Sequence, residues 1–232
     1  MIALIAGLAR GFSGFGAALI FVPVVSALVS PRVAAPLLLV IDAVLTLPMI
    51  RPAFAQVEFR QLAIMFGGAV VTVPLGTWLL VVGDALTLRW MIAGLAVAML
   101  ALLASGWRYR GEPRTHYTIL VGALSGLFSG IGQLGGPPVV AYLLGGKNPA
   151  AQMRAFIIAF FFTTGLLSFV TYAVKHLITW EVLRLAVFAG PAYGIGLYLG
   201  SRMFGLASEA TFRRVCFALI AFAVGVSLPI WH

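Results

Sequence analysis

The amino-acid sequence predicts an all-α, polytopic integral membrane protein built from two homologous halves. Its composition, the spacing of its apolar segments and a motif that occurs twice all support this fold class. Of the 232 residues, 62% are hydrophobic and only 9% are charged, and the mean hydropathy is +1.09. A soluble domain carries about a quarter charged residues, so the composition excludes a soluble enzyme, a disordered tail and a fibrous repeat.

The apolar segments have the length of membrane spans. A helix needs about 20 apolar residues to cross the hydrocarbon core, and eight stretches roughly meet this requirement. The polar separators are short, the longest running from Ser105 to His116, so we expect the protein to act within the bilayer. The predicted segments are 2–29, 33–50, 62–82, 86–105, 117–145, 155–174, 182–203 and 212–230.

Two short motifs recur in the same order and indicate an internal duplication. The run FSGFG at 12–16 returns as FSGIG at 128–132, and LGTWL at 75–79 resembles IGLYL at 195–199. The break between the copies falls in the longest polar separator. The sequence therefore predicts three parts, which are a first membrane repeat (1–104), a cytoplasmic connecting loop (105–116) and a second membrane repeat (117–232).

The distribution of positive charge separates two ways of threading the repeats. Leaving Arg10 aside, eight full crossings place seven of the other fourteen Lys and Arg residues on each side of the membrane. If 2–29 and 117–145 are hairpins instead, the division becomes ten against four, which is a positive-inside bias. We favour this hairpin threading, which makes the halves inverted repeats. It predicts a multi-pass protein of the plasma (inner) membrane with both termini outside. The alternative, in which segments 2–29 and 117–145 cross the membrane fully, is left open.

Glycine-rich runs interrupt both hairpin segments. A continuous helix through Gly135-Gly136-Pro137-Pro138 is not expected, because proline removes a backbone donor and disfavours helix at the preceding residue. Unwound backbone at membrane depth is tolerated where it lines a cavity, and a restarted helix offers free N–H groups to an anion. The predicted substrate-binding residues are Arg10, Ser13, Gly14, Phe15, Gly16, Ser129, Gly130, Ile131, Gly132, Gln133, Gly135, Gly136 and Pro137.

Close helix packing is the alternative role for these glycines. Ser13, Ser129 and Gln133 add hydrogen-bonding groups that packing does not require, which favours substrate lining at the two breaks. Packing is the preferred interpretation for four other pairs that fit the small-xxx-small pattern. These pairs are Gly7–Gly11, Gly122–Gly126, Gly190–Gly194 and Gly196–Gly200.

Several motifs resemble the TauE/SafE family of sulfite exporters and toluenesulfonate uptake permeases. They are MRAF at 153–156, the GP…GSR pattern within 190–202 and FRR at 212–214, and the resemblance covers essentially the whole chain. It implies a plasma-membrane carrier for small sulfur-containing or organic anions. The first glycine motif departs from the family pattern, since Gly16 is followed by two alanines.

Three charged residues inside or beside the segments are conspicuous. Asp42 lies at the middle of 33–50, where an acid costs about 2.5–3.5 kcal/mol on insertion scales. We expect Arg10, and less directly Arg154, to attract an anionic substrate, because arginine binds oxyanions bidentately. Asp42 then orients an arginine or carries a coupling proton. The alternatives are that Arg10 extends to the interface and that Asp42 makes a structural hydrogen bond. Pro48 is expected to kink its helix.

The sequence predicts a secondary transporter of small anions, such as sulfite, a sulfonate or a related organic anion, working by alternating access about the two glycine-rich breaks. A carrier or channel for another small solute, neutral or cationic, is the alternative. No enzyme, cofactor or metal site is expected, because the three histidines are far apart and Cys216 is the single cysteine. Nucleic acid is not expected despite the net charge of +9, since membrane topology accounts for it. The sequence leaves open whether the protein forms a homodimer.

Overall fold

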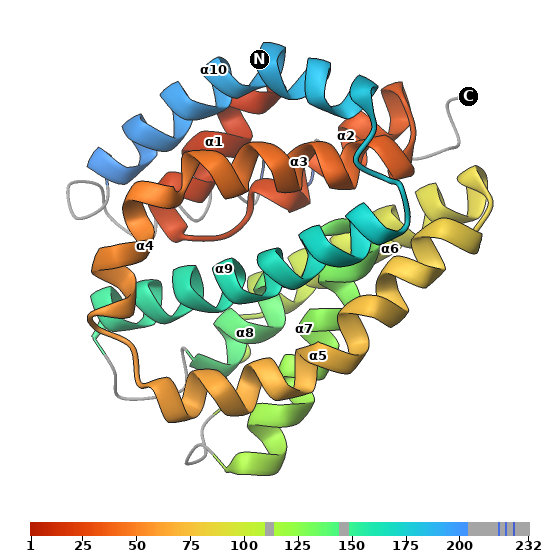
Figure 1. Cartoon of the computed structure of the whole chain (residues 1–232). Coiled ribbons are helices and arrows are strands. Elements are labelled where there is room, and N and C mark those ends of the chain that lie inside the picture. The colour runs from red at the N-terminus through yellow and green to blue at the C-terminus, as the bar shows by residue number, and fades with distance from the viewer. Residues whose placement is uncertain (110–113, 144–148, 204–217, 219–220, 222–224, 226–232) are drawn as a thin grey trace.

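The computed structural model describes residues 1–109, 114–143 and 149–203, together with the single positions 218, 221 and 225. Every regular element in these residues is a helix (Figure 1), which confirms the predicted all-α fold class. The elements are α1 (Ile2–Ser13), α2 (Ala17–Leu28), α3 (Pro31–Leu45), α4 (Leu47–Phe54), α5 (Phe59–Val82), α6 (Ala85–Ala104), α7 (Thr115–Gly132), α8 (Gly136–Leu143), α9 (Ala150–Val174) and α10 (Trp180–Met203).

Among the described residues, four helices are long and apolar enough to cross a membrane, namely α5, α6, α9 and α10. The pair α3 and α4 gives a fifth candidate span, and α1 and α2 are shorter apolar helices. These helices fit the multi-pass membrane protein that the composition predicts. The eighth predicted segment, 212–230, lies outside the described residues apart from three positions.

The segment predicted at 33–50 is not one continuous helix. α3 ends at Leu45, α4 begins at Leu47, and their axes are bent by 65°. Pro48 is the second residue of α4, so it supplies no backbone donor to the preceding turn and disfavours helix just before it. Thr46 occupies the bend, where its hydroxyl donates to the carbonyl oxygen of Asp42 at 2.7 Å. The kink expected at Pro48 is thus present as a helix break.

Both glycine-rich segments are broken where the motifs predict. α1 ends in Gly14, whose φ of 79° is left-handed and whose N–H donates to the Arg10 carbonyl. Gly16, with φ of 94°, precedes α2. At the second motif Gln133 takes the left-handed φ of 60°, and α8 restarts at Gly136 with proline in its first turn, a position that suits proline. We call residues 14–16 break 1 and residues 133–135 break 2.

The most extensive helix contacts join the two predicted halves. α1 packs along α10, and α5 packs along α7. Figure 1 shows the first pair at one end of the molecule and the second pair at the other, with α3, α8 and α9 between them. Each half therefore provides the packing partner for a broken segment of the other.

Glycine permits this close approach between helices. A Cβ atom added to Gly11 would lie 2.8 Å from the amide nitrogen of Ser201 on α10. Glycines on α10, α5 and α7 meet the backbone of the partner helix in the same way, so the packing interpretation is correct for three of the four pairs, which are Gly7–Gly11, Gly122–Gly126 and Gly196–Gly200.

The fourth pair behaves differently. No described atom lies within 4 Å of a Cβ added to Gly190, and one on Gly194 meets only the Leu45 side chain, at 3.5 Å. The close-packing interpretation is therefore wrong for this pair within the described part of the chain. The difference arises because α1 runs along the Gly196–Gly200 side of α10, where Gly7 contacts Tyr193.

Candidate functional site

A cavity of about 300 Å³ lies where the two breaks meet. Break 1 contributes Phe15 and Gly16 to its wall, and break 2 with the start of α8 contributes Gln133, Gly136 and Pro137. Helices α3 and α9 complete the lining. Seven of the fifteen residues singled out from the sequence line this cavity, those five together with Arg10 and Asp42.

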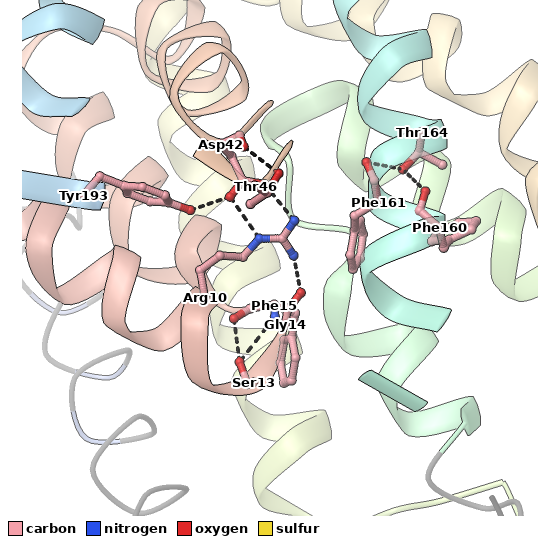
Figure 2. Close-up of polar contacts among 10 residues, drawn as sticks. All are labelled: Arg10, Ser13, Gly14, Phe15, Asp42, Thr46, Phe160, Phe161, Thr164 and Tyr193. Atoms are coloured by element: carbon pink, nitrogen blue, oxygen red, sulfur yellow. Dashed lines mark hydrogen bonds and ion pairs between the residues drawn. The ribbon is translucent and has the colours of Figure 1, made fainter. Parts of the chain in front are cut away.

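Arg10 and Asp42 form a bidentate ion pair at the cavity wall. Arg10 stands in the last turn of α1 and is only 7% exposed. Its Nε donates to Oδ1 of Asp42 at 2.9 Å and its Nη2 donates to Oδ2 at 2.7 Å, while Nη1 donates to the carbonyl oxygen of Gly14 (Figure 2). The Phe161 ring centroid lies 5.7 Å from the guanidinium carbon. Arg10 is thus fixed between an acid, a helix end and an aromatic ring.

Tyr193 completes this cluster from the second half of the chain. It is fully buried on α10, and its hydroxyl donates to Oδ1 of Asp42 at 2.6 Å (Figure 2). The sequence interpretation did not single it out. The sequence carries no signal for it, because its place beside Asp42 depends on the packing of α10 against α1, where Tyr193 contacts Gly7. Arg10, Asp42 and Tyr193, which we call the ionic triad, join α1, α3 and α10.

Two helix N-termini also face the cavity. Ala17 and Ala18 of α2 and Gly136 and Pro137 of α8 belong to its lining. The first N–H groups of a helix have no partner within the helix, and the dipole places partial positive charge there. α2 provides the stronger such site, because two of the first three residues of α8 are prolines without an N–H group.

The remaining lining is largely apolar. Besides Arg10 and Asp42, the polar side chains on the wall are those of Thr46 and Gln133. Aromatic and aliphatic side chains form most of the rest, among them Phe15, Phe161, Phe162, Phe169, Leu38, Leu39 and Leu166. A guanidinium group and a helix end within such a wall suit an organic anion.

A family model described as Sulfite exporter TauE/SafE matches residues 1–228. The chain belongs to the TauE/SafE family. It is accordingly a membrane transport protein of the sulfite exporter type, and the resemblance seen in the sequence motifs is confirmed. Comparisons with curated proteins and with solved structures found no match.

Break 1 of this TauE/SafE protein is closed by Ser13. Its hydroxyl has two carbonyl oxygens within reach of its single proton, those of Ala9 at 2.7 Å and Phe15 at 2.6 Å, and it accepts from the Phe15 N–H at 3.3 Å. Ser13 and Gly14 shape the turn and do not belong to the cavity wall. Arg154 lies outside the wall as well, and its Nη2 donates to the Gly11 carbonyl, so it links α9 to α1.

Break 2 of the TauE/SafE chain has a neutral hydrogen-bond network. The Gln133 side-chain amide donates to the Ser129 carbonyl at 3.0 Å and to the Tyr172 hydroxyl at 3.4 Å. Tyr172, fully buried on α9, donates to the Gly130 carbonyl at 2.9 Å. The Ser125 hydroxyl donates to the Gly135 carbonyl at 2.7 Å. This network satisfies the carbonyl groups that the end of α7 leaves without helical partners.

Other residues predicted around break 2 lie behind the cavity. Gly130 packs against the backbone of α5, where an added Cβ would lie 2.8 Å from the Thr77 amide nitrogen. Ile131 is buried in the main apolar core, and Gly132 and Gly135 are likewise buried away from the wall. Ser129 is buried, and its hydroxyl finds no hydrogen-bond partner among the described residues.

The described residues contain no group of three or more His, Cys, Asp and Glu side chains placed to hold a metal ion. His116 and His176 lie on exposed positions near helix ends. Cys216 and His232 fall outside the described residues.

Proposed function

We propose that this TauE/SafE protein is a secondary carrier for an organic anion with a compact apolar body, such as a sulfonate. The observation that carries the proposal is the cavity at the junction of the two breaks, with Arg10 on its wall. The carrier belongs in the plasma (inner) membrane, with both termini outside.

The charge arrangement supports an anion over a cation. The N-terminus of α2 supplies partial positive charge at the cavity, and Arg10 adds a full charge once it leaves Asp42. Asp42 is the acid on the wall, and its carboxylate is already engaged by Arg10 and Tyr193. A cationic solute would have to compete with that pair, which disfavours the alternative of a cation carrier.

The apolar wall supports an organic anion over a bare inorganic one. Small-molecule sites are mostly apolar, with a few polar groups that orient the ligand, and the rings of Phe15, Phe161 and Phe162 surround this cavity. Sulfite buries no apolar surface there and still loses its hydration, whereas an aryl or alkyl sulfonate gains about 25 cal/mol per Å² of apolar surface buried. We therefore expect organic sulfonates to bind more tightly than sulfite or sulfate.

Alternating access fits the position of the breaks between the two repeats. Break 1 continues into α1, which packs on α10 of the other repeat, and break 2 continues into α7, which packs on α5. Rocking of the α1–α10 pair against the α5–α7 pair would carry break 1 with one pair and break 2 with the other, and so open one side of the cavity at a time. Inverted repeats with broken helices at the substrate site work in this manner.

Counterflow in proteoliposomes tests this function. Vesicles loaded with unlabelled benzenesulfonate should accumulate labelled benzenesulfonate, and excess unlabelled benzenesulfonate outside should compete better than sulfite, sulfate or acetate. Arg10→Lys should weaken uptake because the bidentate geometry is lost, while the exposed Arg202→Lys serves as the matched control. Absence of counterflow for every anion, or uptake of a cation instead, would contradict the proposal.

Cysteine labelling tests the threading. After Cys216→Ser, a single cysteine introduced beside Met1 should react with an impermeant maleimide from outside intact cells. One placed at Trp107, an exposed residue within the connecting loop, should react only after the membrane is permeabilised. The opposite pattern would rule out hairpins with both termini outside.

A further inference from the structure

Arg10 is not available to a substrate in this structure. Its Nε and Nη2 atoms both donate to the Asp42 carboxylate, at 2.9 and 2.7 Å, and Nη1 donates to the Gly14 carbonyl. These are the donors with which arginine grips a planar oxyanion bidentately. The Asp42 carboxylate therefore occupies the position that the anionic group of a substrate needs.

The ionic triad is electrically neutral, and the positive charge of Arg154 interacts with that of Arg10. Within the described residues, the side chain of Asp42 interacts only with Arg10 from α1 and Tyr193 from α10. Helix α2 carries no titratable side chain, and α9 places Arg154 within electrostatic reach of Arg10, where its Nη2 donates to the Gly11 carbonyl. One positive and one negative group thus face the cavity when no ligand is bound.

An anion that enters beside an ionised Asp42 would add a second negative charge at a low-dielectric site. Like charges a few ångströms apart repel strongly where water is scarce, and an uncompensated buried charge is costly. A proton on Asp42 removes this conflict and releases Arg10 for the substrate. The Asp42 side chain is 23% exposed and lines the cavity, so water can deliver a proton to it.

We propose that the carrier binds one proton together with each anion, with the proton on the Asp42 carboxylate, and so operates as a proton–anion symporter. This inference rests on the proposed function. The proton comes from the aqueous phase that supplies the anion, attaches to Oδ1 or Oδ2 of Asp42, and leaves into the phase that receives the anion. In the empty site the charges of Arg10 and Asp42 cancel. With a monovalent anion and a proton bound, the charges of Arg10 and the anion cancel, so the site has no net charge in either state.

Tyr193 is the positioning residue for the transfer of Arg10 from Asp42 to the substrate. Its hydroxyl holds Oδ1 of Asp42 at 2.6 Å, so the acid keeps one partner when Arg10 turns to the substrate. Because Tyr193 lies on α10 and Asp42 on α3, that hydrogen bond keeps the protonated acid within reach of Arg10 on α1. Arg10 and Asp42 then pair again after the anion and the proton have left.

The second break supports a stoichiometry of one proton. Gln133 and Tyr172 provide a neutral network there, and the cavity wall contains one carboxylate, that of Asp42. One acid paired with one cation predicts one proton per anion. Transport of a monovalent anion is then insensitive to membrane potential.

Benzenesulfonate is the suitable probe, because it stays ionised at neutral pH and cannot carry the proton itself. Proteoliposomes of the full chain, containing a pH-sensitive dye, receive external benzenesulfonate at a clamped membrane potential. The lumen should acidify by one proton per anion, and accumulation should approach about tenfold per unit of inward pH gradient. Uptake without proton movement, or uptake that follows the potential and ignores the pH gradient, overturns the inference while leaving the carrier function intact. Absence of counterflow overturns both.

Asp42→Asn provides the second arm. It removes the proton site and frees Arg10, so counterflow should persist with a lower KM, whereas accumulation driven by a pH gradient should be lost and uptake should become sensitive to potential. Tyr193→Phe keeps both charges and should shift the pH profile of uptake with a smaller change in counterflow. If Asp42→Asn still accumulates benzenesulfonate tenfold per pH unit, the proton site is elsewhere and the inference is wrong. The wild-type measurement decides the issue even if Asp42→Asn fails to fold.

Discussion

Two neighbouring glycines on α5 allow a sharp test of how closely α5 packs against α7. Gly68 faces α7, where an added Cβ would lie 2.9 Å from the Ala123 amide nitrogen and closer still to the Ile119 carbonyl oxygen. Gly67, one residue earlier, has no described atom within 4 Å of such a Cβ. We predict that Gly68→Ala destabilises the protein and that Gly67→Ala does not.

The magnitude follows from the geometry. Ordinary contacts of a Cβ begin at 3.4 Å, so the Gly68→Ala methyl group is at least 0.5 Å too close to backbone atoms, which have no rotamer to change. Overpacking of this kind costs about 1–3 kcal/mol. Alanine's higher helix propensity favours both variants by about 1 kcal/mol, so the difference between them isolates the overpacking cost.

Thermal unfolding in detergent, followed by the helical circular dichroism signal, measures that difference. A chain of this size shifts its Tm by about 2–4 °C per kcal/mol, so Gly68→Ala should melt several degrees below Gly67→Ala. Equal melting temperatures for the two variants would refute the close packing of α5 against α7.

Three further predictions concern single hydrogen bonds and one strained residue. Tyr172→Phe should lower Tm, since it leaves the buried Gly130 carbonyl without the hydroxyl 2.9 Å away, a loss of about 1–3 kcal/mol. Gln133→Gly should leave Tm nearly unchanged, because glycine suits the φ of 60° while the amide hydrogen bonds to Ser129 and Tyr172 are lost. It should weaken benzenesulfonate uptake, and unchanged or improved uptake would exclude a role for the amide. Hydrogen bonds from Thr87 lower the pKa of Asp84. The ionised Asp84 cap therefore stabilises the folded protein fully at pH values above the unfolded-state pKa of this carboxyl. That stabilisation is lost as the pH falls through its folded-state pKa. Asp84→Asn should keep the cap and lose this pH dependence in thermal melts, and an unchanged pH dependence would contradict the assignment.

Local chemistry made the two helix breaks predictable from the sequence. Gly14 and Gly16 provide left-handed backbone, and Pro137 and Pro138 prevent a helix from continuing through Gly136. These effects act within a few residues and need no tertiary contact. Residue order alone therefore predicts the all-α fold and the position of both breaks.

Long-range geometry accounts for what the sequence did not reveal. Tyr193 meets Asp42 across 151 residues, and that contact exists because glycines bring α10 against α1. Ser13 and Ser129 were chosen as polar groups beside the breaks, but whether a hydroxyl faces the cavity depends on the rotation of a helix about its axis. Neither lines the wall, since α1 and α7 turn their small-residue faces toward α10 and α5 and fix that rotation.

The same rotation explains why only one break has a charged group. The repeated motif aligns Arg10 with Gly126, because both precede an FSG sequence by two residues. At Gly126 an added Cβ would already lie 2.7 Å from the Cα atom of Ala69 on α5, so α7 has no room for a long side chain there. Arg10 faces α3 and the cavity, while its neighbour Gly11 meets α10. The structure therefore accommodates one arginine–aspartate pair at the two breaks, and a single pair is what the proposed symport of one proton with one anion requires.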